Sequence, residues 1–495
     1  MTRKEVLVTF ILGVTISLSA NFQYGFSSTY LNTPVDEFKD HFNQSFVKWG
    51  KNLSSDNIDL VYNLISNIWF VGFFMGIWLS PLLNDRWGRR VGFLIGNSFS
   101  LLASCLRALS IVTYQPEILF VGRLLASVCT AVTYQSNILY LQEVSPTKYR
   151  GFMSFLSEIC YAGMALLGML LGTDQVLGKH LFWLLFVGVP ASSLALIALY
   201  FLPETPKFLL IVKKDRVAAE KSVIYYHGKT CDTQYVLDEI QLEAESEKDE
   251  ASFKQGTIDM FTIPHLRRAL FLSCAALQNT VALWSLLLNS TQFLQDADVN
   301  DWDKQLSKWT STAMALFYFG STMMASAVVE RAGRRPLLLW FTALNMLSIA
   351  SFVVFAELRN SVNVLKYGCV FSLIFYGFTY GGAVGPVSWF IPAELVPQRY
   401  RSLNQSLSYA INTVSVVATT FTVIPLYNAM GSYAFLVLYT APSVVCIIYL
   451  YFYLPETTGR EIHEIVDELK GNKKKKQKVY RVEFPDLGKK PVEGV

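Results

Sequence analysis

Charge is scarce in this sequence. Only 16% of its 495 residues are Asp, Glu, Lys or Arg, whereas 52% are hydrophobic, and the formal net charge is +4. With a mean hydropathy of +0.34, the chain is too apolar for an ordinary soluble globular protein. Its basic residues do not gather into a patch with interleaved aromatic side chains, which argues against nucleic-acid binding. We therefore expect the lipid bilayer to be the solvent of most of the chain.

Several kinds of chemical site are also missing. Most of the seven cysteines lie inside apolar runs, so the sequence indicates no extracellular disulfide framework. The five histidines are scattered, without metal-ligand spacing. The sequence has no Gly-x-x-x-x-Gly-Lys-Ser/Thr loop, so ATP-driven pumping has no support. We expect no metal, no bound cofactor and no enzymatic reaction.

Long apolar runs, in contrast, are abundant. A helix crosses a hydrocarbon core of about 30 Å with about 20 mostly apolar residues. Twelve stretches meet this requirement: residues 6–28, 62–83, 91–113, 118–140, 152–172, 181–202, 269–293, 310–329, 336–357, 366–390, 402–426 and 433–454. The sequence thus predicts an all-α integral membrane protein, whose first apolar run is a retained span rather than a cleaved signal peptide.

Three charged motifs occur twice, in the same order. Glu143 to Arg150 and Glu394 to Arg401 both read E-x-x-P-x-[KR]-Y-R, and Gly-Arg-Arg and Leu-Pro-Glu-Thr recur at similar offsets. Such a repeat indicates two copies of one unit, and a repeated bundle of membrane helices is typical of transporters. The predicted domains are two six-helix bundles at 1–206 and 269–457, a polar helical linker at 207–268 and a tail at 458–495.

The placement of Lys and Arg predicts the orientation. These residues concentrate in alternate loops and in the Lys473 to Lys476 run, so both termini are expected to be cytoplasmic. The first outer loop then carries two N-x-Ser sequons for glycosylation, at Asn43 and Asn52. We expect a multi-pass protein of the plasma membrane.

The repeated motifs bring arginines and carboxylates to the predicted cytoplasmic helix ends. The candidates for ion pairs are Asp85, Arg86, Arg89, Arg90, Glu143, Arg150 and Glu204 in the first half, and Glu330, Arg331, Arg334, Arg335, Glu394, Arg401 and Glu456 in the second. Arginine forms bidentate pairs with carboxylates. We hypothesise that these pairs close the cytoplasmic side when the outer side is open. The alternative is that the arginines only obey the positive-inside rule; we favour pairing, because the acids recur too.

Further motifs identify a resemblance. They are Gln23-Tyr24-Gly25-Phe26, the [DE]-R-x-G-R-R loops, Gly122-Arg123, Pro203-Glu204-Thr205-Pro206, Gly385-Pro386 with Trp389, and Pro455-Glu456-Thr457-Thr458-Gly459-Arg460. Over nearly its whole length the chain resembles the sugar porter family of the major facilitator superfamily, and most of all the animal facilitative glucose transporters. The resemblance implies the major facilitator fold, with twelve transmembrane helices in two pseudo-symmetric halves, a cytoplasmic helical linker, and a sugar site at the midplane reached alternately from either side.

The resemblance also implies a set of sugar contacts, and here the sequence departs from the family. Expected substrate contacts are Gln23, Glu158, Gln278, Asn279, Trp284, Tyr318, Trp389 and Asn412. Trp284 replaces a sugar-binding Asn, Glu158 replaces a Gln, and Gly381 replaces a Glu in the tenth span. Amides and carboxylates read sugar hydroxyls, so these changes weaken or redirect hexose recognition. Trp284 is either a substrate contact or a packing residue between helices.

Glu158 is the sharpest anomaly, because a carboxylate in mid-span is expensive and marks a functional site by default. It is a sugar acceptor, a proton-coupling group or a protonated spectator, and sugar contact is favoured because proton-coupled relatives use a first-span Asp where this chain has Ser27. Arg107 is expected to extend toward the outer interface.

The predicted function is facilitative transport of a sugar by alternating access, with a hexose as the favoured substrate. The alternatives are a proton-coupled transporter, a carrier of a polyol or organic acid, and a transporter-like sugar sensor without appreciable flux. Expected partners are the sugar and the lipid bilayer.

Overall fold

The structure is a computed structural model that describes residues 3–145, 150–228, 231–246, 253–297, 305–358, 362–458, 460 and 462–470. Within these ranges every regular element is helical. Eleven helical stretches are long and apolar enough to cross a membrane, and a shorter apolar helix covers Phe155–Leu171. These stretches coincide with the twelve predicted spans, so the prediction of an all-helical membrane fold is confirmed.

The first half of the chain folds into a bundle with a short helix at one end and three at the other. Its helices are α1 (Arg3–Thr29), α2 (Val35–Lys48), α3 (Ser55–Trp87), α4 (Arg89–Thr113), α5 (Pro116–Val144), α6 (Arg150–Leu171), α7 (Leu181–Phe186), α8 (Gly188–Tyr200), α9 (Pro206–Ile211), α10 (Arg216–His227) and α11 (Thr233–Ser246).

The second half contains more interrupted helices. They are α12 (Phe253–Thr262), α13 (Pro264–Gln278), α14 (Val281–Asp296), α15 (Gln305–Ala332), α16 (Arg334–Leu358), η2 (Asn363–Leu365), α17 (Lys366–Thr379), η3 (Tyr380–Val384), α18 (Gly385–Glu394), α19 (Gln398–Met430), η4 (Gly431–Tyr433), η5 (Leu436–Thr440), α20 (Ala441–Tyr453) and α21 (Ile462–Leu469). The π-helical η3 falls in a glycine-rich stretch, where the backbone has little side-chain hindrance.

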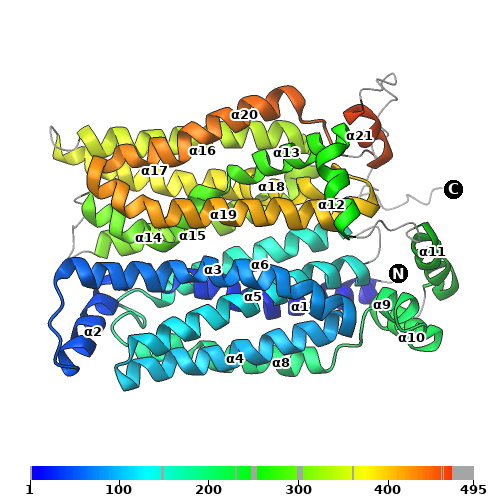
Figure 1. Cartoon of the computed structure of the whole chain (residues 1–495), viewed down its shortest axis with the longest axis horizontal. Coiled ribbons are helices and arrows are strands. Elements are labelled where there is room, and N and C mark those ends of the chain that lie inside the picture. The colour runs from blue at the N-terminus through cyan, green and yellow to red at the C-terminus, as the bar shows by residue number, and fades with distance from the viewer. Residues whose placement is uncertain are drawn as a thin grey trace, which may run out of the picture.

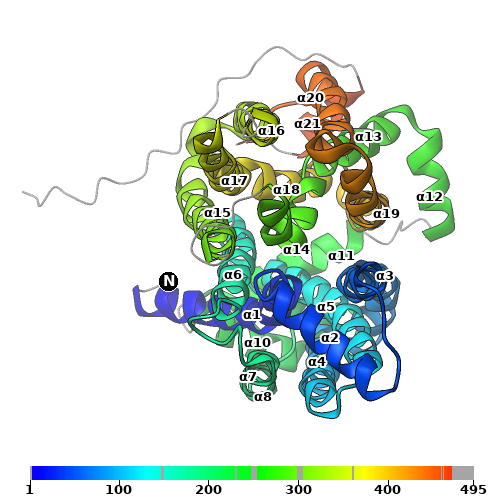
Figure 2. The ribbon, with the colours of Figure 1, turned by 90° about the vertical axis from the view of Figure 1, so that its left-hand side faces the viewer.

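The helices form two bundles that lie side by side with their long axes parallel (Figures 1 and 2). Helices α9 to α12 and α21 lie at one end, called here the linker end, and α2 lies at the other, called the α2 end (Figure 1). The linker helices divide between the bundles. The Tyr226 hydroxyl of α10 lies 2.7 Å from that of Tyr140 on α5, whereas Tyr400 on α19 donates to Asp259 of α12 at 3.0 Å.

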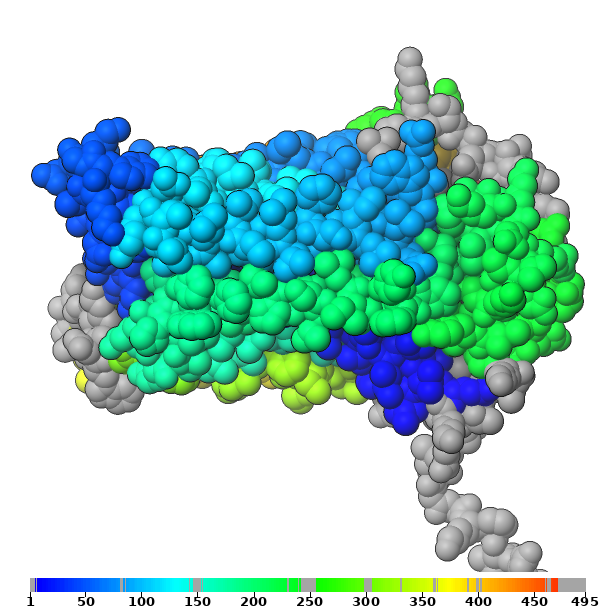
Figure 3. Space-filling model, turned by 90° about the horizontal axis from the view of Figure 1, so that it is seen from below, coloured from blue at the N-terminus to red at the C-terminus, as the bar shows by residue number. Residues whose placement is uncertain are grey.

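Large apolar side chains cover the outward faces of both bundles. Leu194 of α8 is 67% exposed, Phe371 of α17 65% and Val445 of α20 69%. Figure 3 shows the long outward face of the first bundle, with α2 projecting at one end. Apolar surface of this extent fits contact with lipid tails rather than water.

Arg107 departs from its expected position. Its side chain is fully buried and donates to Ser27 Oγ at 2.6 Å, Gln23 Oε1 at 2.9 Å and Ser104 Oγ at 2.9 Å. The expectation that it extends to the interface is wrong, because hydroxyl and amide groups of α1 and α4 satisfy the guanidinium inside the bundle.

Gly381 occupies a place that admits no side chain. A Cβ there would lie 2.2 Å from Ser321 Oγ and 2.4 Å from the Tyr318 carbonyl oxygen of α15, whereas a Cβ at Gly320 would meet no atom within 4 Å. A Glu, which the family carries at this position, would not fit here, because η3 packs too closely on α15.

We predict that Gly381→Ala destabilises the protein by about 1–3 kcal/mol, because the backbone of α15 must give way. Gly320→Ala should leave the melting temperature in detergent unchanged or slightly raised, since alanine favours the helix. Equal melting temperatures for the two variants would show that η3 tolerates a side chain.

Candidate functional site

A cavity lies between the two bundles. Its volume, including its open mouth, is about 550 Å³, and its walls come from α5, α6, α18 and α19. It is lined by Tyr134, Ile138, Leu141, Ser157, Glu158, Pro386, Trp389, Ala393, Gln405 and Tyr409. Leu141, Ala393 and Gln405 stand near the linker-end termini of their helices. The cavity therefore extends from the middle of the molecule toward the linker end.

The walls combine hydrogen-bonding groups with aromatic faces. Glu158 supplies a carboxylate, Gln405 an amide, and Tyr134 and Tyr409 supply phenols. The rings of Trp389 and Tyr409 meet edge to face at 4.8 Å, and the Tyr409 hydroxyl donates to the Trp389 carbonyl at 2.9 Å. Such a lining can bond several hydroxyls of a ligand and cover an apolar ring face.

One hydrogen bond in the cavity wall joins the bundles. The hydroxyl of Tyr318, a fully buried residue of α15, donates to Glu158 Oε1 of α6 at 2.6 Å. Next to Glu158, the Ser157 hydroxyl accepts from Asn137 at 2.8 Å and from Asn21 at 3.1 Å. The Glu158 carboxylate is thus held by a hydrogen bond from the second bundle. The neighbouring Ser157 hydroxyl is held by two hydrogen bonds within the first bundle.

On the side of the cavity that faces the α2 end, aromatic rings pack between the two bundles. Trp284 of α14 lies among rings of the first bundle, with centroid distances of 5.8 Å to Tyr24, 5.7 Å to Phe70 and 6.0 Å to Tyr161. The Trp284 side chain is only 6% exposed. In this conformation the Trp284 indole packs between the two bundles, and its role as a substrate contact stays a prediction.

The other expected substrate contacts lie elsewhere. Gln23 is inside the first bundle, where its Nε2 donates to Ser104 Oγ at 2.8 Å and Ser192 Oγ at 2.7 Å. Asn279 is buried and donates to the Ala275 carbonyl at 3.1 Å. Asn412 is also buried, Gln278 is half-buried, and neither of them is among the residues that line the cavity.

Only Glu158 and Trp389 of the expected contacts therefore line the cavity, with Tyr318 bound to one of them. Gln405 and Tyr409 were missed by the sequence reasoning. Together with the predicted Asn412 they stand at positions i, i+4 and i+7 of α19, which share one face of a helix, so this spacing was the signal that could have found them.

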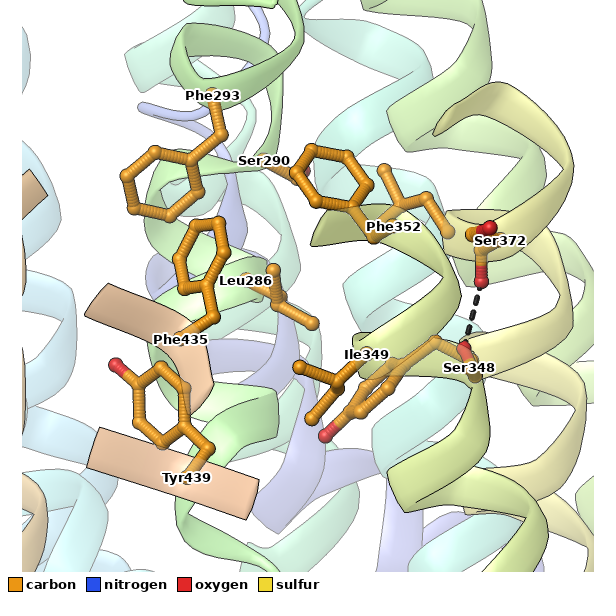
Figure 4. Close-up of a pocket in the computed structure, with 11 residues that line it drawn as sticks. Leu286, Ser290, Phe293, Ser348, Ile349, Phe352, Ser372, Phe435 and Tyr439 are labelled. Carbon is orange, nitrogen blue, oxygen red and sulfur yellow. Dashed lines mark hydrogen bonds between the residues drawn. The ribbon is translucent and has the colours of Figure 1, made fainter. Parts of the chain in front are cut away.

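A second cavity, of about 390 Å³, lies within the second bundle (Figure 4). It is bounded by Leu286 and Phe293 of α14, Ile349 and Phe352 of α16, and Phe435 of η5, among others. Its one hydrogen bond drawn in Figure 4 runs from the Ser348 hydroxyl to the Ser372 carbonyl at 2.7 Å. Its lining contains neither a carboxylate nor an amide, whereas the cavity between the bundles has both, in Glu158 and Gln405.

The repeated motifs form the same arrangement at the linker end of each bundle. Arg89 Nε donates to Glu143 Oε1 at 2.9 Å, and Arg334 pairs with Glu394. Each pair joins two helices of one bundle. Burial raises the pKa of Glu143 above its ordinary value, although the Arg89 guanidinium opposes this.

The Pro-Glu-Thr carboxylates cap helix starts. Glu204 accepts from the Arg90 backbone N–H at 3.1 Å, and Glu456 accepts from those of Arg334 at 3.0 Å and Arg335 at 3.2 Å. An anion at a helix N-terminus satisfies free N–H groups and the helix dipole. Gly88 (φ +107°) and Gly333 (φ +88°) make the turns that admit these carboxylates.

The remaining predicted ion-pair residues are less informative. Arg86 is exposed. The side chains of Asp85, Arg150, Glu330, Arg331 and Arg401 lie outside the described part of the structure, as do residues 146–149 of the first E-x-x-P motif. No described contact tests whether the pairs close a passage.

The two sequons differ in their surroundings. Asn52 is exposed in the connection between α2 and α3. Asn43 is exposed within α2, but Ser45 of its sequon is buried and donates to the His41 carbonyl at 2.8 Å. Asn52 is the more accessible acceptor of the two.

Comparisons with known proteins agree with this arrangement. The profile of the family "Sugar (and other) transporter" matches residues 12–469. Facilitated glucose transporter member 7 of solute carrier family 2 from Mus musculus is 27% identical over 457 residues, which cover 90% of this chain and 86% of that protein. Member 5 from Mus musculus is 27% identical over 500 residues, covering 99% and 97%.

Solved structures share the fold. The proton:xylose symporter XylE bound to 6-bromo-6-deoxy-D-glucose matches with a TM-score of 0.73 and 15% identity, over 93% of this chain and 99% of that chain. The inward-open conformation of the xylose transporter XylE from E. coli matches with a TM-score of 0.72 and 16% identity, over 92% and 99%. At these identities the likeness concerns the fold alone.

We predict that Tyr318→Phe lowers stability by about 1.5–3 kcal/mol, because it removes a hydrogen bond to a carboxylate and leaves that carboxylate without its donor. The matched control is Tyr376→Phe, whose buried hydroxyl has no hydrogen-bond partner among the described residues. That change should cost less than about 0.5 kcal/mol or stabilise the protein. Melting temperatures in detergent measure both, and an equal loss in the two variants would contradict the assigned bond.

Proposed function

The chain belongs to the sugar transporter family of the major facilitator superfamily, a family of multi-pass membrane transporters, and we propose that this member carries a hexose by alternating access, as a uniporter. The observation that supports this most is the cavity between the bundles, whose walls are polar and aromatic. The cavity extends toward the linker end, and aromatic rings pack between the bundles on its α2-end side. A carrier needs such a site, bounded by two bodies that move relative to each other.

The lining favours a sugar over an apolar solute. The Glu158 carboxylate accepts hydrogen bonds from sugar hydroxyls, the Gln405 amide accepts and donates them, and Trp389 and Tyr409 offer aromatic faces to the C–H surface of the sugar ring. The glucose transporters among the relatives favour a hexose. Polyols and organic acids remain the competing substrates.

Two observations bear on coupling. Ser27 stands where proton-coupled relatives of this family carry an Asp, which supports uniport. The second candidate, proton symport, is favoured by Glu158, an acid in the cavity wall whose bond to Tyr318 spans the bundles. A group of that kind could link a proton to the rocking of the bundles.

We assign the linker end to the cytoplasm, with both termini on that side and the α2 end outside, at the plasma membrane. The positive loops and the exposed sequon at Asn52 support this orientation. The conformation described is then inward-facing. The arginine–carboxylate pairs brace each bundle at its cytoplasmic end, and in the proposed cycle they also approach the opposite bundle when the cytoplasmic side closes.

We predict saturable uptake of radiolabelled D-glucose or another hexose by proteoliposomes, with the same initial rate with and without a pH gradient. A panel with fructose, xylose, inositol and lactate identifies the preferred class. Gradient-dependent uptake that Glu158→Gln abolishes would establish symport instead. The absence of flux for all solutes, together with sugar binding, would indicate a sensor.

We further predict that Gln405→Leu raises the KM for the transported sugar about tenfold with little change in kcat, the effect of losing one hydrogen bond worth roughly 1.4 kcal/mol. The control Gln234→Leu changes an exposed glutamine of α11 far from the cavity. A KM for Gln405→Leu within twofold of the parent would remove Gln405 from the site.

A further inference from the structure

Polar contacts between the bundles gather at the α2 end. Asn32, just after α1, donates from Nδ2 to Ser290 Oγ of α14 at 2.7 Å and accepts from the Thr291 backbone N–H at 3.2 Å. Gln295 at the end of α14 donates to Asp36 Oδ2 of α2 at 3.3 Å. These bonds exist only while the bundles touch at this end.

The most charged of these contacts centres on Lys308 of α15. Its side chain is only 2% exposed, and its Nζ lies 2.9 Å from Glu37 Oε1 of α2 and 2.6 Å from Asp174 Oδ1, in the turn after α6. Gln305, one turn earlier on α15, donates to Asp174 Oδ2 at 2.6 Å. These four residues are called the Lys308 cluster; both acids come from the first bundle, and the cation and amide come from the second.

We infer that the Lys308 cluster is the lock that holds the α2 end closed and sets how readily the bundles part there. A buried ammonium is tolerated only with its counter-ions in contact. When the bundles separate, all three charges return to water and the short-range bonds are lost. The cluster therefore acts on the equilibrium between closed and open α2 ends, which goes beyond the proposed substrate contacts.

The two acids contribute unequally. Burial opposes ionisation of Asp174, but its hydrogen bonds from Lys308 and Gln305 prevail and lower its pKa. At Glu37 burial prevails over the same ammonium and raises the pKa. Lys308 Nζ also lies closer to Asp174 than to Glu37, at 2.6 Å against 2.9 Å, and Gln305 donates a further hydrogen bond to Asp174, so Asp174 is the principal counter-ion of Lys308. We expect Asp174→Asn to weaken the lock more than Glu37→Gln.

The first bundle supplies a matched control. Lys39 and Asp59 form an ion pair of 2.8 Å, also at the α2 end, but both belong to the first bundle and their side chains are 23% and 42% exposed. Breaking this pair changes charge at the same end without touching a contact between bundles. An exposed pair of this kind also contributes little to stability.

Asn289 of α14 provides the readout, because it is 1% exposed in the closed state and adjoins the Ser290 contact to Asn32. In a Cys105→Ser background, which removes an exposed thiol, Asn289→Cys is treated with a membrane-impermeant maleimide in nanodiscs. Lys308→Met should accelerate modification at least fivefold, since Glu37 and Asp174 are then left facing each other without a cation. Lys39→Met should leave the rate unchanged.

Two more variants separate the lock from general damage. Lys308→Arg keeps the positive charge and should keep modification within about twofold of the parent. The neutral triple variant Glu37→Gln, Asp174→Asn, Lys308→Met removes the repulsion and should react more slowly than Lys308→Met alone. An unchanged rate in Lys308→Met, or equal acceleration by Lys39→Met, overturns the proposal. The maleimide modification rate is measured without any transport of substrate. The result therefore does not depend on whether the protein transports a hexose.

Discussion

The bilayer supplies no hydrogen bonds, so the polar groups inside the two bundles must find partners within the protein or do without, as the Tyr376 hydroxyl does among the described residues. The backbone satisfies this demand by forming helices throughout the described spans. Arg123 satisfies it by donating to the carbonyls of Ile65, Ser66 and Ser27, so that its charge fastens α5 to α3 and α1. Among the described residues, Glu158 meets the same demand through the opposite bundle, by accepting a hydrogen bond from Tyr318. A polar group whose hydrogen-bond partners lie in its own bundle stabilises that bundle. A polar group whose partner lies in the other bundle loses its hydrogen bond when the two bundles move apart.

The two ends of the molecule follow this distinction. At the linker end, each ion pair and each helix cap joins helices of a single bundle and makes that bundle rigid. The first bundle has the Arg89–Glu143 pair and the Glu204 cap, and the second has the Arg334–Glu394 pair and the Glu456 cap. At the α2 end, Lys308 and Asn32 reach across. Rigid bodies with a breakable contact at one end and a cavity at the other have the mechanics that alternating access requires.

How far the sequence could predict this structure depends on the range of the interaction involved. The spans and the repeat follow from composition and spacing, which are local properties, and Glu158 was found because a charge in a span is conspicuous by itself. Gln23 was assigned to the substrate by motif, but its partners Ser104 and Ser192 lie 81 and 169 residues away in the chain. The Lys308 cluster joins residues up to 271 positions apart in the chain. In the sequence, neither Glu37 nor Asp174 differs from the other acids in the polar segments between spans. Such encounters are decided by tertiary packing, which a single sequence does not display.

The division of the linker between the bundles has a mechanical consequence. Helix α11 ends at Ser246 beside the first bundle, and α12 begins at Phe253 beside the second. Only seven Cα–Cα steps separate these residues, and a fully extended chain covers at most about 25 Å in that number of steps, at ~3.5 Å each. The covalent chain itself is therefore a tether with a finite length, and it limits how wide the mouth at this end can open, whatever the cargo.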